Sequence, residues 1–230
     1  MSQEAFEELI EAATAQLPDS SAIAERCKAE LQLPLCWTSR FLSNGTGTHC
    51  EVLLRGCYGS AVEAVSLIAL GLLRPAVLSL RSYYELSLQF LYYKDHPVEW
   101  RNVLDYRSQP TLPGVNKKYL KDNYCDFELR TKELLKKKLR EHDDCYDVLS
   151  GVAHGTAYNS ISQAASPKEL LVSCDTLEQS EQIFLSTSEF LSDIHVASFE
   201  GNWLSLPDEV RGNLETRFGA GSGASVLKMQ

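Results

Sequence analysis

The 230-residue chain lacks the short patterns that mark phosphate loops, zinc sites and redox pairs. It contains no Walker A or GxGxxG loop, no GxSxG turn and no HExxH helix. Its seven cysteines are odd in number, irregularly spaced and without a CxxC pair, which argues against a zinc knuckle or a thioredoxin-like site. Its five histidines follow no metal-ligand spacing. We therefore expect neither a metal ion nor a cofactor.

An export signal and a long hydrophobic run are also missing. The opening residues, MSQEAFEELIEA, are acidic and amphipathic, whereas a signal peptide begins basic and continues apolar. The most apolar stretch, Gly59–Tyr93, is interrupted by four charged residues: Glu63, Arg74, Arg81 and Glu85. Its longest uncharged run is ten residues, and a membrane span needs about 20. We expect no membrane association, and reduced thiols in a cytoplasmic protein.

The chain is acidic overall but contains one basic segment. The formal net charge is −9, so the molecule as a whole does not attract nucleic acid. Between residues 115 and 141, however, nine basic residues stand against five acidic ones. This segment is either a solvated helix face or a surface that contacts phosphates. In the second interpretation, RNA binds to Lys132, Lys136, Lys137, Lys138 and Arg140.

The apolar stretch predicts two consecutive helices, about Cys50–Leu73 and Pro75–Lys94. Pro75 suits the first turn of a helix, and Gly71 lies where a break costs little. The second helix is apolar around most of its circumference, which is typical of a buried helix. It nevertheless carries Arg81 and Glu85 one turn apart.

The remaining chain also reads as helical. We predict a helix over Glu4–Gln16 that is broken at Leu17–Ser20, and a charged, mostly exposed helix from Val115 to about Glu141 that is either continuous or broken near Asn123. Further helices are predicted over about 145–154 and 175–199. No repeat and no hairpin signal is present. The sequence thus predicts an all-α helical bundle with additional N- and C-terminal helices, one domain over 1–217 and a flexible tail over 218–230.

Two groups of residues could carry chemistry. Arg81 could bind a phosphate with Glu85 as its base or anchor, or the two could form a buried structural ion pair. His154 closes the segment CYDVLSGVAH, where the negative end of the helix dipole favours an imidazolium that can transfer a proton. Asp147 and Ser150 lie on the same helix stripe. His154 could equally be a helix-end histidine that bonds a free carbonyl.

Taken together, these segments resemble a known superfamily. A helix carrying LSLRSYYELSLQFLYYKDHP, followed about 60 residues later by YDVLSGVAHG, is similar to the HEPN-like superfamily, and in particular to a bacterial branch with an R…E helix and a later S…H helix. The resemblance covers roughly Cys57–Tyr158. The matching positions are Arg81, Glu85, Asp95-His96-Pro97, Ser150 and His154.

The resemblance implies a helical bundle that forms a homodimer with an RNA-facing cleft. Active members are metal-independent endoribonucleases of toxin–antitoxin and phage-defence systems, with an antitoxin or defence protein as partner. In that case His154 transfers protons, Arg81 binds the phosphate and Glu85 orients Arg81. Ser150 or Tyr84 would assist them.

The chain departs from the family in one respect. Members usually carry an arginine four to six residues before a histidine on one helix, and no histidine here has an arginine at that spacing. Either Arg81 supplies the cation from a neighbouring helix, or the nuclease site is absent. The alternative is a non-catalytic binding or regulatory module of such a system, in which Arg81, Glu85 and His154 form a polar network or bind a small ligand.

Overall fold

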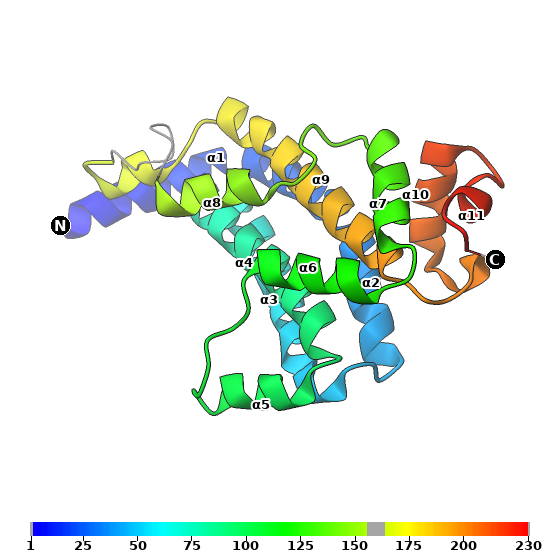
Figure 1. Ribbon diagram of the computed structural model, residues 1–230. Helices are drawn as coiled ribbons and strands as arrows, with labels where there is room; N and C mark the ends of the chain where they lie inside the picture. The colour runs from blue at the N-terminus through cyan, green and yellow to red at the C-terminus, as the bar shows by residue number, and fades with distance from the viewer. Residues whose placement is uncertain (1, 156–163, 230) are drawn as a thin grey trace.

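The computed structural model describes residues 2–155 and 164–229, and within these ranges the regular structure is entirely helical (Figure 1). The prediction of an all-α protein is confirmed. The α-helices are α1 (Gln3–Glu30), α2 (Gln32–Ser43), α3 (Glu51–Ala69), α4 (Leu73–Tyr93), α5 (Pro97–Leu104), α6 (Pro113–Asn123), α7 (Phe127–Lys136), α8 (Tyr146–His154), α9 (Cys174–Ala197), α10 (Asp208–Phe218) and α11 (Gly223–Val226). The described residues also contain three short 3₁₀ helices: η1 (Thr48–Cys50), η3 (Pro167–Leu170) and η4 (Trp203–Ser205).

The predicted pair of apolar helices is present as α3 and α4, which pack against each other. Gly71 joins them in a left-handed conformation (φ +75°) that only glycine adopts without strain. The core side chains of α4 include Leu80, Tyr83, Leu88 and Phe90, all fully buried. The helix therefore lies inside the bundle, as its composition predicts.

Helix α9 is enclosed more completely than α4, although its sequence is far more polar. Every residue from 186 to 198 is buried, including Ser186, Thr187 and Ser188. In Figure 1, α9 crosses the middle of the molecule, and it packs against α1, α2, α4 and α7. The sequence pattern predicts a single apolar face for this helix. The structure instead surrounds the helix on all sides from residue 186 onward.

Helix α1 continues through Pro18, so the predicted break at Leu17–Ser20 is wrong. Proline removes one backbone donor and normally ends or kinks a helix. Here the next turns are fixed by tertiary contacts, because Ser20 Oγ donates to the Ala69 carbonyl at 2.7 Å and Ile23 and Cys27 are buried. Packing against α3 outweighs the local cost of the proline.

The basic segment breaks at Asn123, the position that the sequence offers for a break, and so forms two helices rather than one long exposed helix. Helix α6 ends at Asn123, and Asp126 adopts a positive φ of 57° before α7 begins. Helix α7 ends at Lys136. Arg130 is buried, and its Nε donates to the Leu227 carbonyl at 2.9 Å.

The C-terminal residues pack on the bundle, so the predicted flexible tail over 218–230 is wrong for the residues described. Helix α11 lies in this segment, and Leu227 and Met229 are 0% and 1% exposed. Gly223 lies so close to the Trp203 ring that an added Cβ would meet it at 2.5 Å. A composition rich in glycine and serine predicts flexibility only where no partner surface is near.

A buried group of charged side chains joins the segment after α7 to α9 and α10. We call it the Arg217 cluster: Arg140, Glu189, Asp193 and Arg217, whose side chains are 1–5% exposed. Arg140 Nη1 lies 2.8 Å from Glu189 Oε1, and Arg217 Nη1 lies 2.6 Å from Asp193 Oδ1. Two cations therefore face two anions in the interior, where each needs a partner.

Candidate functional site

Helices α4 and α8 pack together and bring three of the predicted site residues into contact. Arg81 Nε donates to Glu85 Oε1 at 2.9 Å, and Arg81 Nη1 lies 3.4 Å from His154 Nε2. Because a guanidinium only donates hydrogen bonds, the hydrogen bond in this contact has Nε2 of the imidazole as its acceptor. We call Arg81, Glu85, Tyr146 and His154 the Arg81 cluster.

Tyr146 is the member of the cluster that sequence reasoning missed. Its hydroxyl accepts from Arg81 Nη2 at 3.3 Å and donates to Glu85 Oε1 at 3.3 Å. The guanidinium also lies over the Tyr146 ring, 5.5 Å from the centroid. The spacing along the chain could have indicated Tyr146, because Tyr146, Ser150 and His154 recur every four residues on one stripe of α8.

The Arg81 cluster remains open to solvent. The Arg81 and Glu85 side chains are 19% and 29% exposed, and His154 is exposed. Burial alone would lower the pKa of Arg81, but the Glu85 carboxylate and the Tyr146 hydroxyl raise it above its ordinary value. Arg81 is thus a permanently charged group, fixed on two sides by its neighbours and accessible to a ligand beside His154.

Tyr84 does not present its hydroxyl to the Arg81 cluster. The side chain is fully buried, and its hydroxyl donates to Asp144 Oδ1 at 3.0 Å. Burial and the Asp144 carboxylate raise the pKa of Tyr84 far above its ordinary range. Its ring stacks on the Tyr146 ring with centroids 5.4 Å apart, so Tyr84 packs against the cluster from the protein interior. Tyr146, rather than Tyr84, places a hydroxyl beside Arg81 and Glu85.

Ser150 lies one turn before His154 on α8 and is half-buried. Among the described residues, no hydrogen bond joins Ser150 to Arg81 or His154. Its position follows the stripe that the sequence predicts. Ser150 therefore lies near the cluster without a direct hydrogen bond to Arg81 or His154.

The five residues predicted to bind RNA are dispersed. Lys136 pairs with Glu133 at 2.6 Å, Lys138 pairs with Asp143, and Lys137 is exposed. Arg140 is a buried member of the Arg217 cluster, so its assignment to an exposed basic surface is wrong. Nothing in the linear sequence distinguishes this arginine from its lysine neighbours, since the residues that bury it come from α9 and α10.

The fifth residue, Lys132, lines a shallow groove between α6, α7 and α9 with a volume of about 370 Å³. Three more lysines line the same groove: Lys117, Lys118 and Lys121. The apolar lining includes Phe127, Phe190 and Ile194. Among the described residues, Lys117 pairs with Asp144 and Lys121 with Glu128, whereas Lys118 and Lys132 form no close ion pair. The pKa of Glu128 is lowered first by its hydrogen bond with Lys121 and, to a smaller extent, by the charge of Lys132.

This groove connects to the Arg81 cluster through packed rings. The Phe190 ring stacks on Tyr84 with centroids 5.3 Å apart, and Tyr84 stacks in turn on Tyr146. Asp144 bridges the same two sites, since it accepts from the Tyr84 hydroxyl and from Lys117 Nζ. The buried Tyr84 ring and the Asp144 carboxylate therefore lie between the groove and the Arg81 cluster.

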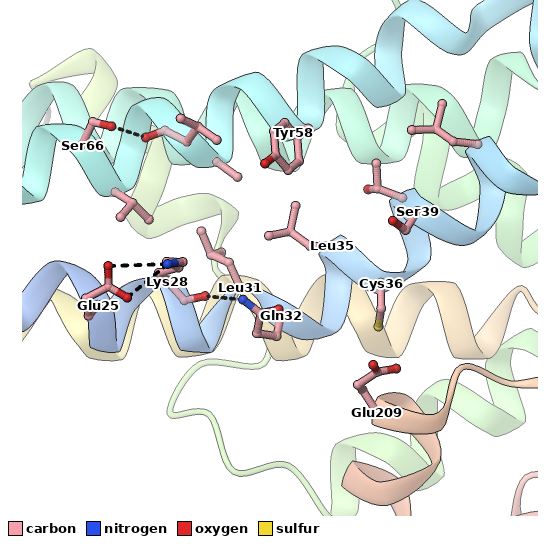
Figure 2. Close-up of a pocket in the computed structure, with 15 residues that line it drawn as sticks. Glu25, Lys28, Leu31, Gln32, Leu35, Cys36, Ser39, Tyr58, Ser66 and Glu209 are labelled. Atoms are coloured by element: carbon pink, nitrogen blue, oxygen red, sulfur yellow. Dashed lines mark hydrogen bonds and ion pairs between the residues drawn. The ribbon is translucent and has the colours of Figure 1, made fainter.

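A larger cavity of about 690 Å³ lies between α1, α2 and α3. Figure 2 shows Tyr58 and Leu35 pointing into it and Cys36 facing Glu209. Its charged groups Glu25 and Lys28 pair with each other at 3.1 Å. Burial first, and Glu209 second, raise the pKa of the Cys36 thiol to about 11, so this cysteine is a poor nucleophile at neutral pH. The cavity offers no proton-transfer pair comparable to the Arg81 cluster.

Neither a metal cluster nor a relative points to a different site. Within residues 2–155 and 164–229, no three His, Cys, Asp or Glu side chains are grouped so that they could hold a metal ion. Comparison with protein-family models, with curated proteins and with solved structures finds no match to this chain.

The segment Thr48–Ala69 is long and apolar enough to cross a membrane by length and composition, criteria that core helices of soluble proteins also meet.

Proposed function

We propose that the protein is a metal-independent endoribonuclease that acts on a phosphodiester bound beside Arg81 and His154. The observation that carries this proposal is the 3.4 Å approach of Arg81 Nη1 to His154 Nε2 at an exposed position. A non-bridging phosphate oxygen that enters this position meets a fixed cation, and a proton-transfer group lies beside it. Both are needed for RNA cleavage through the 2′-hydroxyl.

In the proposed reaction, the 2′-oxygen attacks phosphorus, and the bond from phosphorus to the 5′-oxygen breaks. The unprotonated Nε2 of His154 accepts the 2′-hydroxyl proton, and the same imidazolium then delivers a proton to the leaving 5′-oxygen. Arg81 stabilises the charge that develops on the phosphorane, while Glu85 and Tyr146 keep the guanidinium in place. The products are a 2′,3′-cyclic phosphate and a 5′-hydroxyl.

The lysine-lined groove supports RNA as the substrate. Lys118 and Lys132 form no close ion pair among the described residues, and the phosphates of a single strand are their natural counter-ions. The groove replaces the linear set of basic residues as the proposed RNA-binding surface, with Lys132 common to both. Binding is then expected to weaken as salt rises.

The test is cleavage of an end-labelled single-stranded RNA by the purified protein in the presence of EDTA. His154→Ala is expected to slow cleavage by about 10²- to 10⁴-fold, the usual contribution of a proton-transfer group. His142→Ala is the matched control, because His142 is exposed and lies outside the cluster. A parent protein that leaves the RNA intact, or equal rates for parent and His154→Ala, would overturn the proposal.

The second candidate is a module that binds an anionic ligand without cleaving it. The specific observation in its favour is the 2.9 Å contact of Glu85 with Arg81, which offsets part of the guanidinium charge needed for cleavage but leaves the lysines of the groove able to bind an anion. This function predicts salt-sensitive RNA binding that Lys118→Ala and Lys132→Ala weaken, with no cleavage products. Fluorescence anisotropy and the cleavage assay on the same RNA distinguish the two candidates.

A further inference from the structure

The first turns of α1 present large apolar side chains to solvent. Phe6 is 47% exposed, Ile10 is 64% exposed and Leu17 is 43% exposed. Their spacing of four and seven residues places them on one side of the helix, which we call the α1 stripe. In Figure 1, this part of α1 extends toward one end of the molecule, far from α10 and α11.

The later turns of the same helix bury their apolar side chains in the core, whereas the α1 stripe leaves its apolar side chains exposed. After Ser20, the helix places Ile23, Ala24 and Cys27 in the core, each at most 4% exposed. The part of the helix before Ser20 still has an N-cap, because Ser2 Oγ accepts a hydrogen bond from the Ala5 amide. Single exposed apolar residues are common on protein surfaces, but an aligned row on a capped helix is typical of a docking face.

The charge around the α1 stripe selects the kind of partner. The segment from residue 3 to residue 19 contains five acidic side chains and no basic one: Glu4, Glu7, Glu8, Glu11 and Asp19. A second copy of the chain would bring two such acidic segments together, and an anionic lipid surface would be repelled in the same way. A cationic partner is attracted, both on approach and in the complex.

We infer that the α1 stripe docks a basic amphipathic helix of another protein. The apolar face of that helix covers Phe6, Ile10 and Leu17, and its lysines or arginines lie against the glutamates of α1. This is a helix-on-helix interface in which apolar anchors supply affinity and charge supplies selectivity. It uses none of the residues of the Arg81 cluster, so it stands independently of the nuclease proposal.

The probe is a fluorescein-labelled 18-residue peptide built of leucine and lysine at helical spacing, titrated with the full chain. We expect saturable binding that Phe6→Ser/Ile10→Ser weakens by at least about tenfold. Val98→Ser/Leu104→Ser removes two other exposed apolar residues, on α5, and should leave the affinity unchanged. Glu7→Gln/Glu11→Gln should weaken binding at low salt and reduce its dependence on salt.

The outcomes separate this partner from the other occupants. Absence of binding, or equal affinity for the parent and Phe6→Ser/Ile10→Ser, overturns the inference. A leucine–glutamate peptide that binds equally well overturns the selection by charge. Sedimentation of a parent dimer that Phe6→Ser/Ile10→Ser dissociates would assign the stripe to a second copy. Binding to zwitterionic vesicles that the same variant abolishes would assign it to lipid.

Discussion

The molecule contains two groups in which arginine meets carboxylate, and they differ in their access to water. In the Arg217 cluster the side chains are 1–5% exposed, and two arginines balance Glu189 and Asp193. In the Arg81 cluster one arginine meets one carboxylate, the side chains are 19% and 29% exposed, and His154 lies at the surface. The first can do little except hold helices together. The second can accept a ligand.

The comparison shows that an ion pair acquires its role from its surroundings. Arg140 Nη1 contacts both carboxylates, and Leu139 and Arg140 donate backbone amides to Glu189 at 3.0–3.1 Å. Every strong polar group of the Arg217 cluster is thus occupied by protein, apart from Arg140 Nε, which has no partner among the described residues. In the Arg81 cluster the partners hold the guanidinium on two sides and leave its approach from His154 open.

The largest expected effect comes from breaking the sealed cluster. Arg217→Ala leaves Asp193 and Glu189 with a single buried arginine, and we expect the free energy of unfolding in urea to fall by about 3–5 kcal/mol. Arg211→Ala, on the same helix and paired with the exposed Asp208, should cost less than about 1 kcal/mol.

Should Arg217→Ala fail to fold, Arg217→Lys provides a milder version of the same experiment. It keeps the charge and removes the two-pronged contact with Asp193. A variant as stable as the parent would show that the Arg217 cluster does not hold α9 and α10 together.

A second prediction concerns a sealed histidine, His195, which has far less access to water than the exposed His154. His195 is buried against Trp37 and Phe41, and burial, with a smaller contribution from Lys94, lowers its pKa from 6.5 to about 3. The unfolded chain therefore binds a proton below pH 6.5 that the folded chain refuses until about pH 3. Stability contributed by the neutral ring is present above pH 6.5 and is lost as the pH falls through this window.

The expected slope attributable to His195 is up to about 1.4 kcal/mol per pH unit. Urea unfolding at several pH values should give a flatter acid limb for His195→Phe than for the parent. Thr38→Ala is the control, because it removes a buried polar side chain that does not titrate, and its acid limb should follow that of the parent. Parallel curves for parent and His195→Phe would contradict the assignment.

The smallest effect is expected for the open cluster. Arg81→Ala removes a half-exposed ion pair and its bond to Tyr146, and we expect a loss of about 1–2 kcal/mol in the free energy of unfolding. Arg74→Ala, at an exposed position on the same helix, should stay within about 0.5 kcal/mol of the parent. A loss as large as that of Arg217→Ala would mean that the Arg81 cluster is a structural element like its sealed counterpart.

The candidate site was partly predictable because its parts lie on two helices with clear local signals. A charged pair inside an apolar stretch marked Arg81 and Glu85, and a histidine just before Gly155 marked the end of α8. The contact between these helices is a tertiary event, so spacing along the chain gave no distance for it. Tyr146 was missed for the same reason, since its role depends on lying across from Arg81.

The sequence by itself determined the helical class and the two apolar helices α3 and α4, because periodicity, proline and glycine act over a few residues. Only the tertiary structure decided that α1 passes through Pro18, that the last residues pack on the bundle, and that Arg140 is buried while Lys132 lines a groove. These outcomes depend on burial by distant segments. Burial sets the energy of a charge or a broken backbone bond, and the sequence near a residue does not specify it.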